Sequence, residues 1–329
     1  MSLIIIKQGI LDSIQDCGRF GLQHAGINPN GSMDSFASRM ANAILGKELT
    51  APVFEFHFPA AQIQFRKETI VCICGGDFSP AINNQPIPQN HPIAVAKNSI
   101  LTFRKLISGN RCYMSMISGP DVKKWMNSYS TNIKAAAGGW KGRQLKKGDQ
   151  INYRDDLNFS NLLHQKDFII LPWKAADVEK PEINIEFIKG SEWNWLTTEA
   201  QFSFQEGLFQ VSIEADRMGY RLTGKPMQLR ITEQLVSSPV SFGTVQLLPN
   251  GNMIILMADH QTTGGYPRIA HVISAHLPLL AQKKTNDVIQ FKLTDLASAE
   301  QKIIEQEKYL HYLQDACKFK IENILHGSM

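Results

Sequence analysis

The sequence predicts a mainly β fold with a minor helical part, built from barrel or sandwich lobes. Three observations lead to this prediction. Short runs such as "AAQIQF" and "FQVSIEAD" alternate apolar and polar residues, which is the period of a half-buried strand. Gly, Asn, Asp and Pro separate the runs, as in "INNQPIPQN", and these residues mark turns. A regular alternation of strands with long helices is missing, which argues against a doubly wound parallel sheet.

The expected strands follow one another over the first nine-tenths of the chain. They are "LIIIKQG", "AAQIQF", "TIVCICGG", "HPIAVAK", "SILTFRK", "RCYMSMISG", "FIILPW", "INIEFIKG", "FQVSIEAD", "TVQLLP" and "MIILMAD". Among them, apolar residues at helical spacing predict one helix over residues 33–47. Ser32 or Asp34 is its expected N-cap, and Gly46 its expected end.

The C-terminal stretch 294–329 predicts a long amphipathic helix. It is rich in Glu, Gln, Lys and Ala, and its apolar residues repeat every seven positions, at Leu296, Ile303, Leu310, Cys317 and Ile324. Such a helix packs on its own protein or on a partner. Packing on its own domains is the favoured alternative.

Three parts are expected on this basis: an N-terminal β-rich lobe over 1–180, a C-terminal β lobe over 181–293, and the helix over 294–329. A chain of 329 residues is long enough for two domains of ordinary size. The boundary between the lobes is expected near 175–190, where "KAADVEKPEIN" combines charge with a proline before a new strand. Strands shared between the lobes are compatible with this division.

The composition indicates a globular protein and excludes several classes of partner. Hydrophobic residues make up 43% of the chain, enough for a sizeable core. The net charge of +4 comes from 34 basic and 30 acidic residues without a basic run, so neither nucleic acid nor an anionic membrane is an expected partner.

The cysteines and the apolar runs predict a cytoplasmic protein. Five cysteines without a regular framework suit a reducing compartment. Cys72 and Cys74 lie two apart, on one face of an expected core strand. The start of the chain lacks the features of a secretory signal, and no run of about 18 apolar residues predicts a membrane-spanning helix.

Four stretches combine glycines with more hydrogen-bonding side chains than core packing needs. They are residues 13–34, 128–149, 214–224 and 254–276. Glycine permits positive φ and lets a ligand approach the backbone, so each stretch is a candidate wall of a binding site. A solvated connector is the alternative for the first and last stretches, and a structural Asp–Arg pair is the alternative for the third.

Three residues are candidates for catalysis. Asp259 directly follows an apolar run and is expected to emerge at a strand end, while Asp16 and His24 belong to the first polar stretch. Carboxylates and imidazoles orient substrates or accept protons. No metal site is expected, because the histidines lack metal-ligand spacing, and no nucleotide-binding or hydrolase motif occurs.

The candidate substrate-binding residues are cations, amides and hydroxyls. Arginines offer planar forks to carboxylates and phosphates, and the amides of a Gly-Gly turn suit an oxyanion. The candidates are Gln23, Arg217, Tyr220, Arg221, Gln261, Thr262, Thr263, Gly264, Gly265, Tyr266 and Arg268. Together they indicate an anionic or amide-containing small molecule.

Four motifs in order resemble the allophanate-hydrolase-subunit-2 family, also called the biotin-dependent carboxyltransferase-like family. The motifs are "SIQDCGRFGLQHAGINPNGSMD", "AAAGGWKGRQLKKGD", "EADRMGYRLTG" and "MADHQTTGGYPRIAHVISAHL". The resemblance covers about residues 7–292. It implies cyclophilin-like β-barrel lobes, with 181–293 as one such barrel.

The resemblance implies one chain of an enzyme that acts only with partners. The first expectation is the C subunit of an ATP-dependent 5-oxoprolinase, which converts 5-oxoproline to glutamate. ATP would be bound with the partners, which are an allophanate-hydrolase-subunit-1-type protein (the 5-oxoprolinase B subunit) and a LamB/YcsF-type third chain. One alternative is a biotin-dependent carboxyltransferase acting on urea or a related amide, with biotin carried by another chain. A non-catalytic, KipA-like regulatory binding protein is the other.

The sequence departs from the usual family pattern at a few positions. Phe20 stands where the family usually has proline, Asn28-Pro29 replaces a proline pair, and 118–120 replaces Gly-Gly-Ile. His260 stands where arginine is usual. These departures do not change the expected fold, but they leave the identity of the substrate undetermined.

Overall fold

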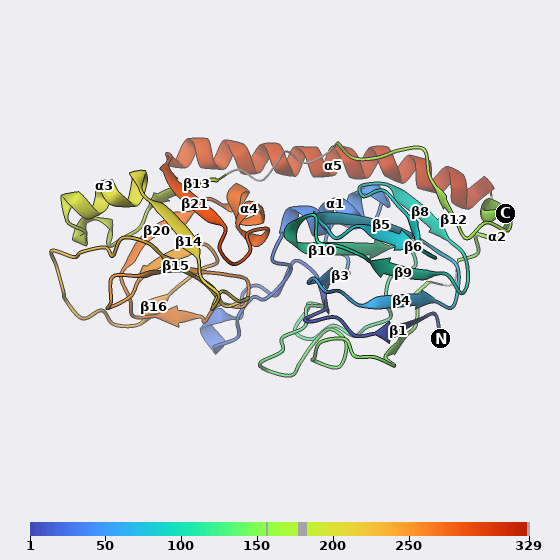
Figure 1. Cartoon of the computed structure of the whole chain (residues 1–329), viewed down its shortest axis with the longest axis horizontal. Helices are drawn as coiled ribbons and strands as arrows, with labels where there is room; N and C mark the ends of the chain where they lie inside the picture. Colours follow the sequence, from blue (N-terminus) through green and yellow to red (C-terminus); the bar gives the residue numbers. More distant parts are fainter. Residues whose placement is uncertain (156, 177–182, 328–329) are drawn as a thin grey trace. The chain divides into compact units, whose positions relative to one another are not determined.

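A computed structural model describes residues 1–155, 157–176 and 183–327. It is mainly β, as predicted, with one long C-terminal helix (Figure 1). The chain forms two compact units. Unit 1 comprises residues 1–18, 34–179 and 307–329, and unit 2 comprises 19–33 and 180–306. The boundary expected near 175–190 falls partly on 177–182, outside the described residues.

Unit 1 contains two six-stranded sheets. The first has the order β11-β1-β4-β9-β6-β7 and is formed by β1 (Leu3–Lys7), β4 (Gln62–Phe65), β6 (Pro80–Ile82), β7 (Gln85–Pro86), β9 (Ile100–Phe103) and β11 (Gln150–Ile151). The second has the order β12-β8-β5-β10-β3-β2 and is formed by β2 (Ser13–Gln15), β3 (Val53–Phe56), β5 (Thr69–Asp77), β8 (Pro92–Val95), β10 (Ser108–Met116) and β12 (Phe168–Ile170). Apolar side chains of both sheets share one core cluster.

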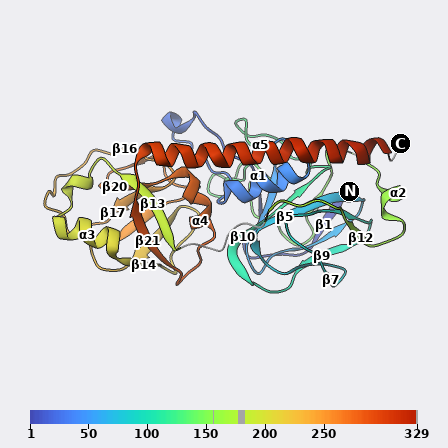
Figure 2. The same ribbon diagram turned by 90° about the horizontal axis from the view of Figure 1, so that it is seen from above.

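The period-two pattern of β5 explains how the second sheet is covered on both faces. Val71 and Ile73 belong to the core shared with the first sheet. Cys72 and Cys74 belong to a second core cluster with helix α1 (Ser35–Ile44), and both are buried free thiols, as expected for a core strand. Figure 2 shows α1 lying along this sheet.

Helix α1 begins and ends as the sequence predicts. The carboxylate of Asp34 accepts a hydrogen bond from the Ala37 N–H at 2.7 Å, which is an N-cap. Gly46 follows the helix with φ +63°, and a Cβ there would lie 2.6 Å from the Lys318 Cα. Glycine is therefore needed at this position both for the left-handed turn and for close packing.

Helix α5 (Leu296–Gly327) packs on the body of the protein. Leu310 and Cys317 of the predicted heptad are buried, whereas Leu296 is exposed. Within unit 1, Arg39 forms an ion pair with Glu307, and the Gln314 amide donates to the Lys47 carbonyl at 2.7 Å. A short helix, α2 (Ser160–Leu163), completes unit 1.

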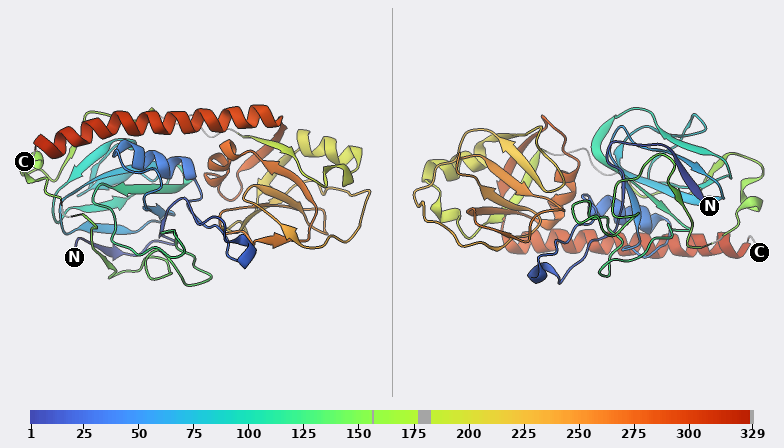
Figure 3. Two further views of the ribbon diagram at one scale, coloured as in Figure 1. Left: turned by 180° about the vertical axis from the view of Figure 1, so that it is seen from behind. Right: turned by 90° about the horizontal axis from the view of Figure 1, so that it is seen from below.

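Unit 2 is a closed seven-stranded barrel with the order β13-β20-β17-β18-β15-β14-β21 (Figure 3). Its strands are β13 (Asn184–Lys189), β14 (Leu208–Val211), β15 (Gly219–Thr223), β17 (Thr244–Leu247), β18 (Met253–Leu256), β20 (Arg268–Val272) and β21 (Val288–Leu293). Outside the barrel lie η1 (Gln23–Ala25), η2 (Trp193–Trp195), α3 (Thr198–Glu206), η3 (Ser274–His276), α4 (Leu277–Ala281) and a two-stranded sheet of β16 (Ser238–Pro239) and β19 (Thr263–Gly264).

Aromatic side chains fill the barrel core. The rings of Phe204 and Phe291 stack at 4.4 Å, and Phe187 meets Phe204 edge-on at 4.9 Å. Met33, from the early segment 19–33, is fully buried in the same core. A segment from the start of the chain therefore contributes to the barrel unit. No helix in the described part of the chain is long and apolar enough to cross a membrane.

Candidate functional site

A row of outward-facing residues on the barrel of unit 2 forms the floor of a pocket. The strand register places Arg221 of β15 opposite Ile254 of β18, and Ile254 opposite Gln246 of β17. Because side chains alternate along a strand, their neighbours Tyr220 and Val245 point into the barrel core. The row thus lies on the outer face.

The turns at 248–250 and 261–266 surround this row, and together they form a pocket of about 350 Å³. Its lining residues are Arg221, Gln246, Leu248, Pro249, Asn250, Ile254, Gln261 and Tyr266. The lining contains one cation, three amides and one phenol, and no carboxylate. A small molecule that carries a carboxylate and an amide group matches these donors and acceptors.

Arg221 is the cation that is available to a ligand. Its Nε lies 3.1 Å from a Glu214 carboxylate oxygen, and the two side chains are 49% and 68% exposed. An ion pair this exposed contributes little, about 1 kcal/mol or less. A ligand carboxylate at the pocket can therefore compete for the guanidinium.

Gln246 is held under the turn that closes the pocket. Although it faces outward, it is only 1% exposed. Its amide nitrogen donates to the Tyr266 carbonyl at 3.5 Å, and its amide oxygen accepts from Gln261 at 3.4 Å. A Cβ on Gly264 would lie 2.5 Å from this amide nitrogen, so glycine lets the turn approach Gln246.

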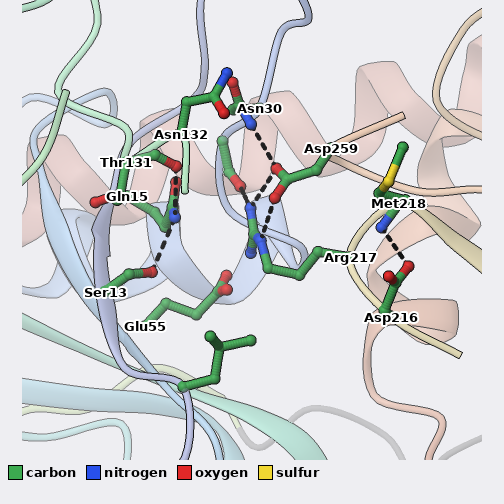
Figure 4. A network of polar contacts seen from close by, with 12 residues as sticks. Ser13, Gln15, Asn30, Glu55, Thr131, Asn132, Asp216, Arg217, Met218 and Asp259 are labelled. Atoms are coloured by element: carbon green, nitrogen blue, oxygen red, sulfur yellow. Dashed lines mark hydrogen bonds and ion pairs between the residues drawn. The ribbon is translucent and has the colours of Figure 1, made fainter. Parts of the chain in front are cut away.

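A second polar cluster of unit 2 surrounds Asp259 (Figure 4). The Arg217 guanidinium donates to both carboxylate oxygens at 2.9 and 3.0 Å, and the Asn30 amide donates to the same carboxylate at 2.7 Å. Arg217 also donates to the Gly31 carbonyl at 2.6 Å, and Arg19 donates to Asn30. The predicted residues Asp259 and Arg217 are thus paired with each other across the fourth and third stretches, whereas the structural alternative was an Asp–Arg pair of the third stretch.

Two further predicted charged residues have carboxylate or backbone partners. The Arg268 guanidinium donates to both oxygens of Glu192 at 3.0 and 2.8 Å. Burial opposes the ionisation of Glu192, but hydrogen bonds from Arg268 outweigh it and lower the pKa of this carboxyl. In unit 1, the buried Asp16 carboxylate accepts from the Ser128 hydroxyl at 2.7 Å and the Tyr129 N–H at 2.6 Å.

The other predicted residues lie around the pocket or apart from it. Gln261 and Tyr266 line the pocket with Arg221, and Gly265 lines a neighbouring groove. Thr263 pairs with β16 and the Thr262 carbonyl accepts from Val240. On η1, His24 is exposed, and Gln23 donates to the Val240 carbonyl at 3.3 Å. Tyr220 is buried in the barrel core.

His260, where the family usually has arginine, is buried at 1% exposure. Its Nδ1 lies 2.6 Å from the Gln261 carbonyl oxygen. Burial lowers the pKa of this imidazole. His260 therefore supports the turn that carries Gln261 and does not line the pocket.

Sequence reasoning missed Gln246 and Asn250 as pocket residues. Gln246 is the outward polar residue of the expected strand "TVQLLP", and Asn250 belongs to "LPNGN", which predicted only a turn. The sequence did contain one signal for Gln246, because a long polar side chain stands there at an outward position of an otherwise apolar strand. Among the described residues, no cluster of His, Cys, Asp or Glu suits a metal ion.

Comparisons with known proteins cover nearly the whole chain. The chain is 32% identical over 302 residues to the 5-oxoprolinase C subunit of Haemophilus influenzae, covering 92% of this chain and 94% of the relative. It is 30% identical to the 5-oxoprolinase C subunit of Escherichia coli, covering 94% and 97%.

A solved structure supports the fold. The urea amidolyase of Kluyveromyces lactis superimposes with a TM-score of 0.85 at 26% identity, over 95% of this chain and 20% of that longer one. Residues 25–293 match the carboxyltransferase domain, subdomain A and B, family. The chain therefore belongs to the carboxyltransferase domain, subdomain A and B, family.

Proposed function

We propose that the chain is the C subunit of an ATP-dependent 5-oxoprolinase, which converts 5-oxoproline to glutamate with partner subunits. The observation that carries this proposal is the end-to-end similarity to two proteins named as the C subunit of 5-oxoprolinase. We further propose that the partners are an allophanate-hydrolase-subunit-1-type protein (the 5-oxoprolinase B subunit) and a LamB/YcsF-type protein, and that the complex works in the cytoplasm. The free cysteines of the described chain suit that compartment.

The pocket on the barrel suits the proposed substrate. 5-Oxoproline is a small ring amide with one carboxylate. Arg221 would hold the carboxylate, while the amides of Gln261 and Asn250 would bind the ring C=O and N–H groups. One guanidinium is enough for this substrate, so the pocket does not need a second cation.

The proposed reaction overcomes the low reactivity of the ring amide. Transfer of the ATP γ-phosphoryl group to the amide oxygen would make the carbonyl carbon open to attack by water. The C–N bond then breaks as the nitrogen takes a proton, which leaves an acyl phosphate at the former ring carbonyl. A second water displaces phosphate from this group, so that two waters are added and glutamate, ADP and phosphate are formed. We propose that ATP is bound together with the partner subunits.

We also assign roles to the charged residues outside the pocket. Arg217 and Arg268 each have a carboxylate partner. We propose that these ion pairs, at Asp259 and at Arg268, hold the two ends of the turn 260–267 in place. In this assignment Asp259 does not contact the substrate. It affects substrate binding only because it fixes the position of the turn that follows it. Asp16 organises the backbone at 128–130 in unit 1, and we propose a positioning role for it as well. His24 keeps the proposed role of a proton acceptor.

Reconstitution with the two partner subunits tests the proposal. We expect ATP-dependent formation of glutamate from 5-oxoproline only when all three chains are present. Arg221→Ala should raise the KM for 5-oxoproline about tenfold, the effect of losing about one charge-assisted hydrogen bond. The matched control, Arg104→Ala, removes an exposed arginine of unit 1 and should leave the KM unchanged. A complete complex without turnover would contradict the proposal.

A biotin-dependent carboxyltransferase is the second candidate. The observation in its favour is the match to urea amidolyase, at a TM-score of 0.85 over 95% of this chain. In this case the activity would consume urea or a related amide and would be blocked by avidin, which sequesters biotin. Turnover of 5-oxoproline that avidin does not affect decides for 5-oxoprolinase.

A further inference from the structure

A groove of about 800 Å³ lies beside the pocket in unit 2. The pocket and the groove share Leu248, Pro249 and Tyr266 in their linings. Five residues of the segment 231–237 line the groove, and Gly265 and Pro267 line it as well. Neither the substrate nor the ATP of the proposed reaction is assigned to this groove.

The backbone N–H and C=O groups of the segment 231–237 are available for hydrogen bonding. Within the described chain, none of its N–H and C=O groups has a hydrogen-bond partner. The segment has no regular secondary structure and leads directly into β16 (Figure 1). Seven residues in a strand span about 23 Å, so the segment is long enough to pair with another strand. Unpaired backbone N–H and C=O groups in a row are templates for pairing with another chain.

The groove begins where the two-stranded sheet of β16 and β19 ends. The last pair of this ladder joins Ser238 and Gly264. Two and three residues further, the Tyr266 carbonyl accepts from Gln246, and the Pro267 carbonyl accepts from the Leu247 N–H at 2.9 Å. Pro267 also lacks an N–H to offer. The backbone at 266–267 therefore belongs to the barrel. Gly265 lies beside Leu235 and Ser237, but within the described chain no backbone group of 231–237 is hydrogen-bonded to this turn.

The lining of the groove matches an extended peptide better than a compact ligand. Its walls combine apolar side chains such as Leu229, Leu235 and Leu248 with exposed polar residues of the segment 231–237. Glu233 is the one charged residue in the lining, which consists of described residues only. A strand partner places alternate side chains on the apolar wall, and a basic residue complements Glu233.

We propose that this groove binds an extended segment of a partner polypeptide, which adds to residues 231–237 as a strand. The segment carries an apolar residue at alternate positions and a basic residue that faces Glu233. The identity of the partner rests on the proposed function, because the partner is one of the two other subunits of that complex. The pocket that shares Tyr266 with the groove would then be completed only in the assembled enzyme.

Hydrogen–deuterium exchange on the reconstituted complex tests the inference. We expect alternate amides of 231–237 to exchange about tenfold more slowly in the complex of all three chains than in this chain alone, because these amides gain a strand partner. An assembled, active complex with unchanged exchange at 231–237 would overturn the groove proposal and leave the proposed function standing. Failure to assemble would overturn both.

Proline substitutions test the backbone hydrogen bonds directly. Glu233 and Gln234 are exposed, so Glu233→Pro and Gln234→Pro remove one N–H each without disturbing the core. Neighbouring N–H groups of a strand point to opposite sides. We therefore expect one of the two proline variants to weaken partner binding about tenfold, while Glu233→Ala and Gln234→Ala bind within about threefold of the original chain. Equal binding by all four variants would overturn the proposal.

Discussion

Arg217 and Asp259 form a two-pronged ion pair inside unit 2. Two guanidinium nitrogens donate to the two carboxylate oxygens at 2.9 and 3.0 Å, and the backbone N–H of Asp259 donates to the Arg217 carbonyl at 2.7 Å. The side chains are 6% and 13% exposed. This pair joins the third and fourth polar stretches of the sequence, and Asn30 joins the first stretch to the same carboxylate. The three stretches therefore support one another.

The first prediction concerns the energy of this pair. Asp259→Ala removes the carboxylate that neutralises the buried Arg217 guanidinium and accepts two of its hydrogen bonds, so we expect the free energy of unfolding to fall by about 3 kcal/mol. The control is Glu214→Ala, which removes the exposed pair with Arg221 and should cost less than about 1 kcal/mol. Urea unfolding of both variants measures the difference. Similar losses in the two variants would contradict a structural role for Asp259.

The second prediction concerns His260 and acid pH. Burial lowers the pKa of His260 in the folded chain, so the unfolded chain binds a proton first as the pH falls below the ordinary value of 6.5. The folded state is fully favoured above that value and loses stability as the pH falls through the lowered pKa. We expect urea unfolding midpoints to fall more between about pH 7.5 and 5 in the original chain than in His260→Asn. Parallel pH profiles would contradict this.

Much of the fold was predictable because it depends on local pattern. The alternation in "TIVCICGG" predicts a strand with two covered faces, and Asp34 and Gly46 mark the ends of α1 from their own chemistry. The placement of Met33 in the barrel core was not predictable, because a contact between 19–33 and strands more than 150 residues later leaves no periodic signal in either.

The candidate site was predictable only in part for a related reason. Arg221, Gln261 and Tyr266 lie in one pocket, and all three stand in polar stretches that core packing does not explain. Glycine and charge content could not separate these residues from Arg217 and Arg268, whose carboxylate partners lie 42 and 76 residues away in the chain. Whether an arginine is paired or available depends on tertiary contacts that a single sequence does not contain.

The third prediction concerns two glycines of the second polar stretch. Both Gly142 and Gly148 have positive φ, at +63° and +89°, so an alanine at either position is strained by about 1 kcal/mol. A Cβ on Gly142 would also lie 2.1 Å from backbone atoms of Ala136, whereas a Cβ on Gly148 meets no atom within 4 Å. We expect Gly142→Ala to destabilise the chain by about 3 kcal/mol and Gly148→Ala by about 1 kcal/mol. Thermal or urea unfolding that gives equal losses would argue against this close packing.

The fourth prediction uses two neighbouring glycines to separate the pocket from the stability of the barrel. Neither Gly264 nor Gly265 has a left-handed φ, so alanine fits the backbone at both. A Cβ on Gly264 would lie 2.5 Å from the Gln246 amide nitrogen, whereas a Cβ on Gly265 lies at an ordinary 3.4 Å from its nearest neighbours. Because the amide is the end of a flexible side chain, Gln246 can swing towards the pocket at a cost of about 1 kcal/mol.

The displaced amide then occupies space that the proposed substrate needs. In the reconstituted complex at saturating partner subunits, we expect Gly264→Ala to raise the KM for 5-oxoproline about tenfold, with kcat changed less than about threefold. Gly265→Ala should leave both constants within about twofold, and both variants should unfold close to the original chain. A KM that rises equally in the two variants would show that the turn acts as a whole. In that event the position of Gln246 under Gly264 would not control access to the pocket.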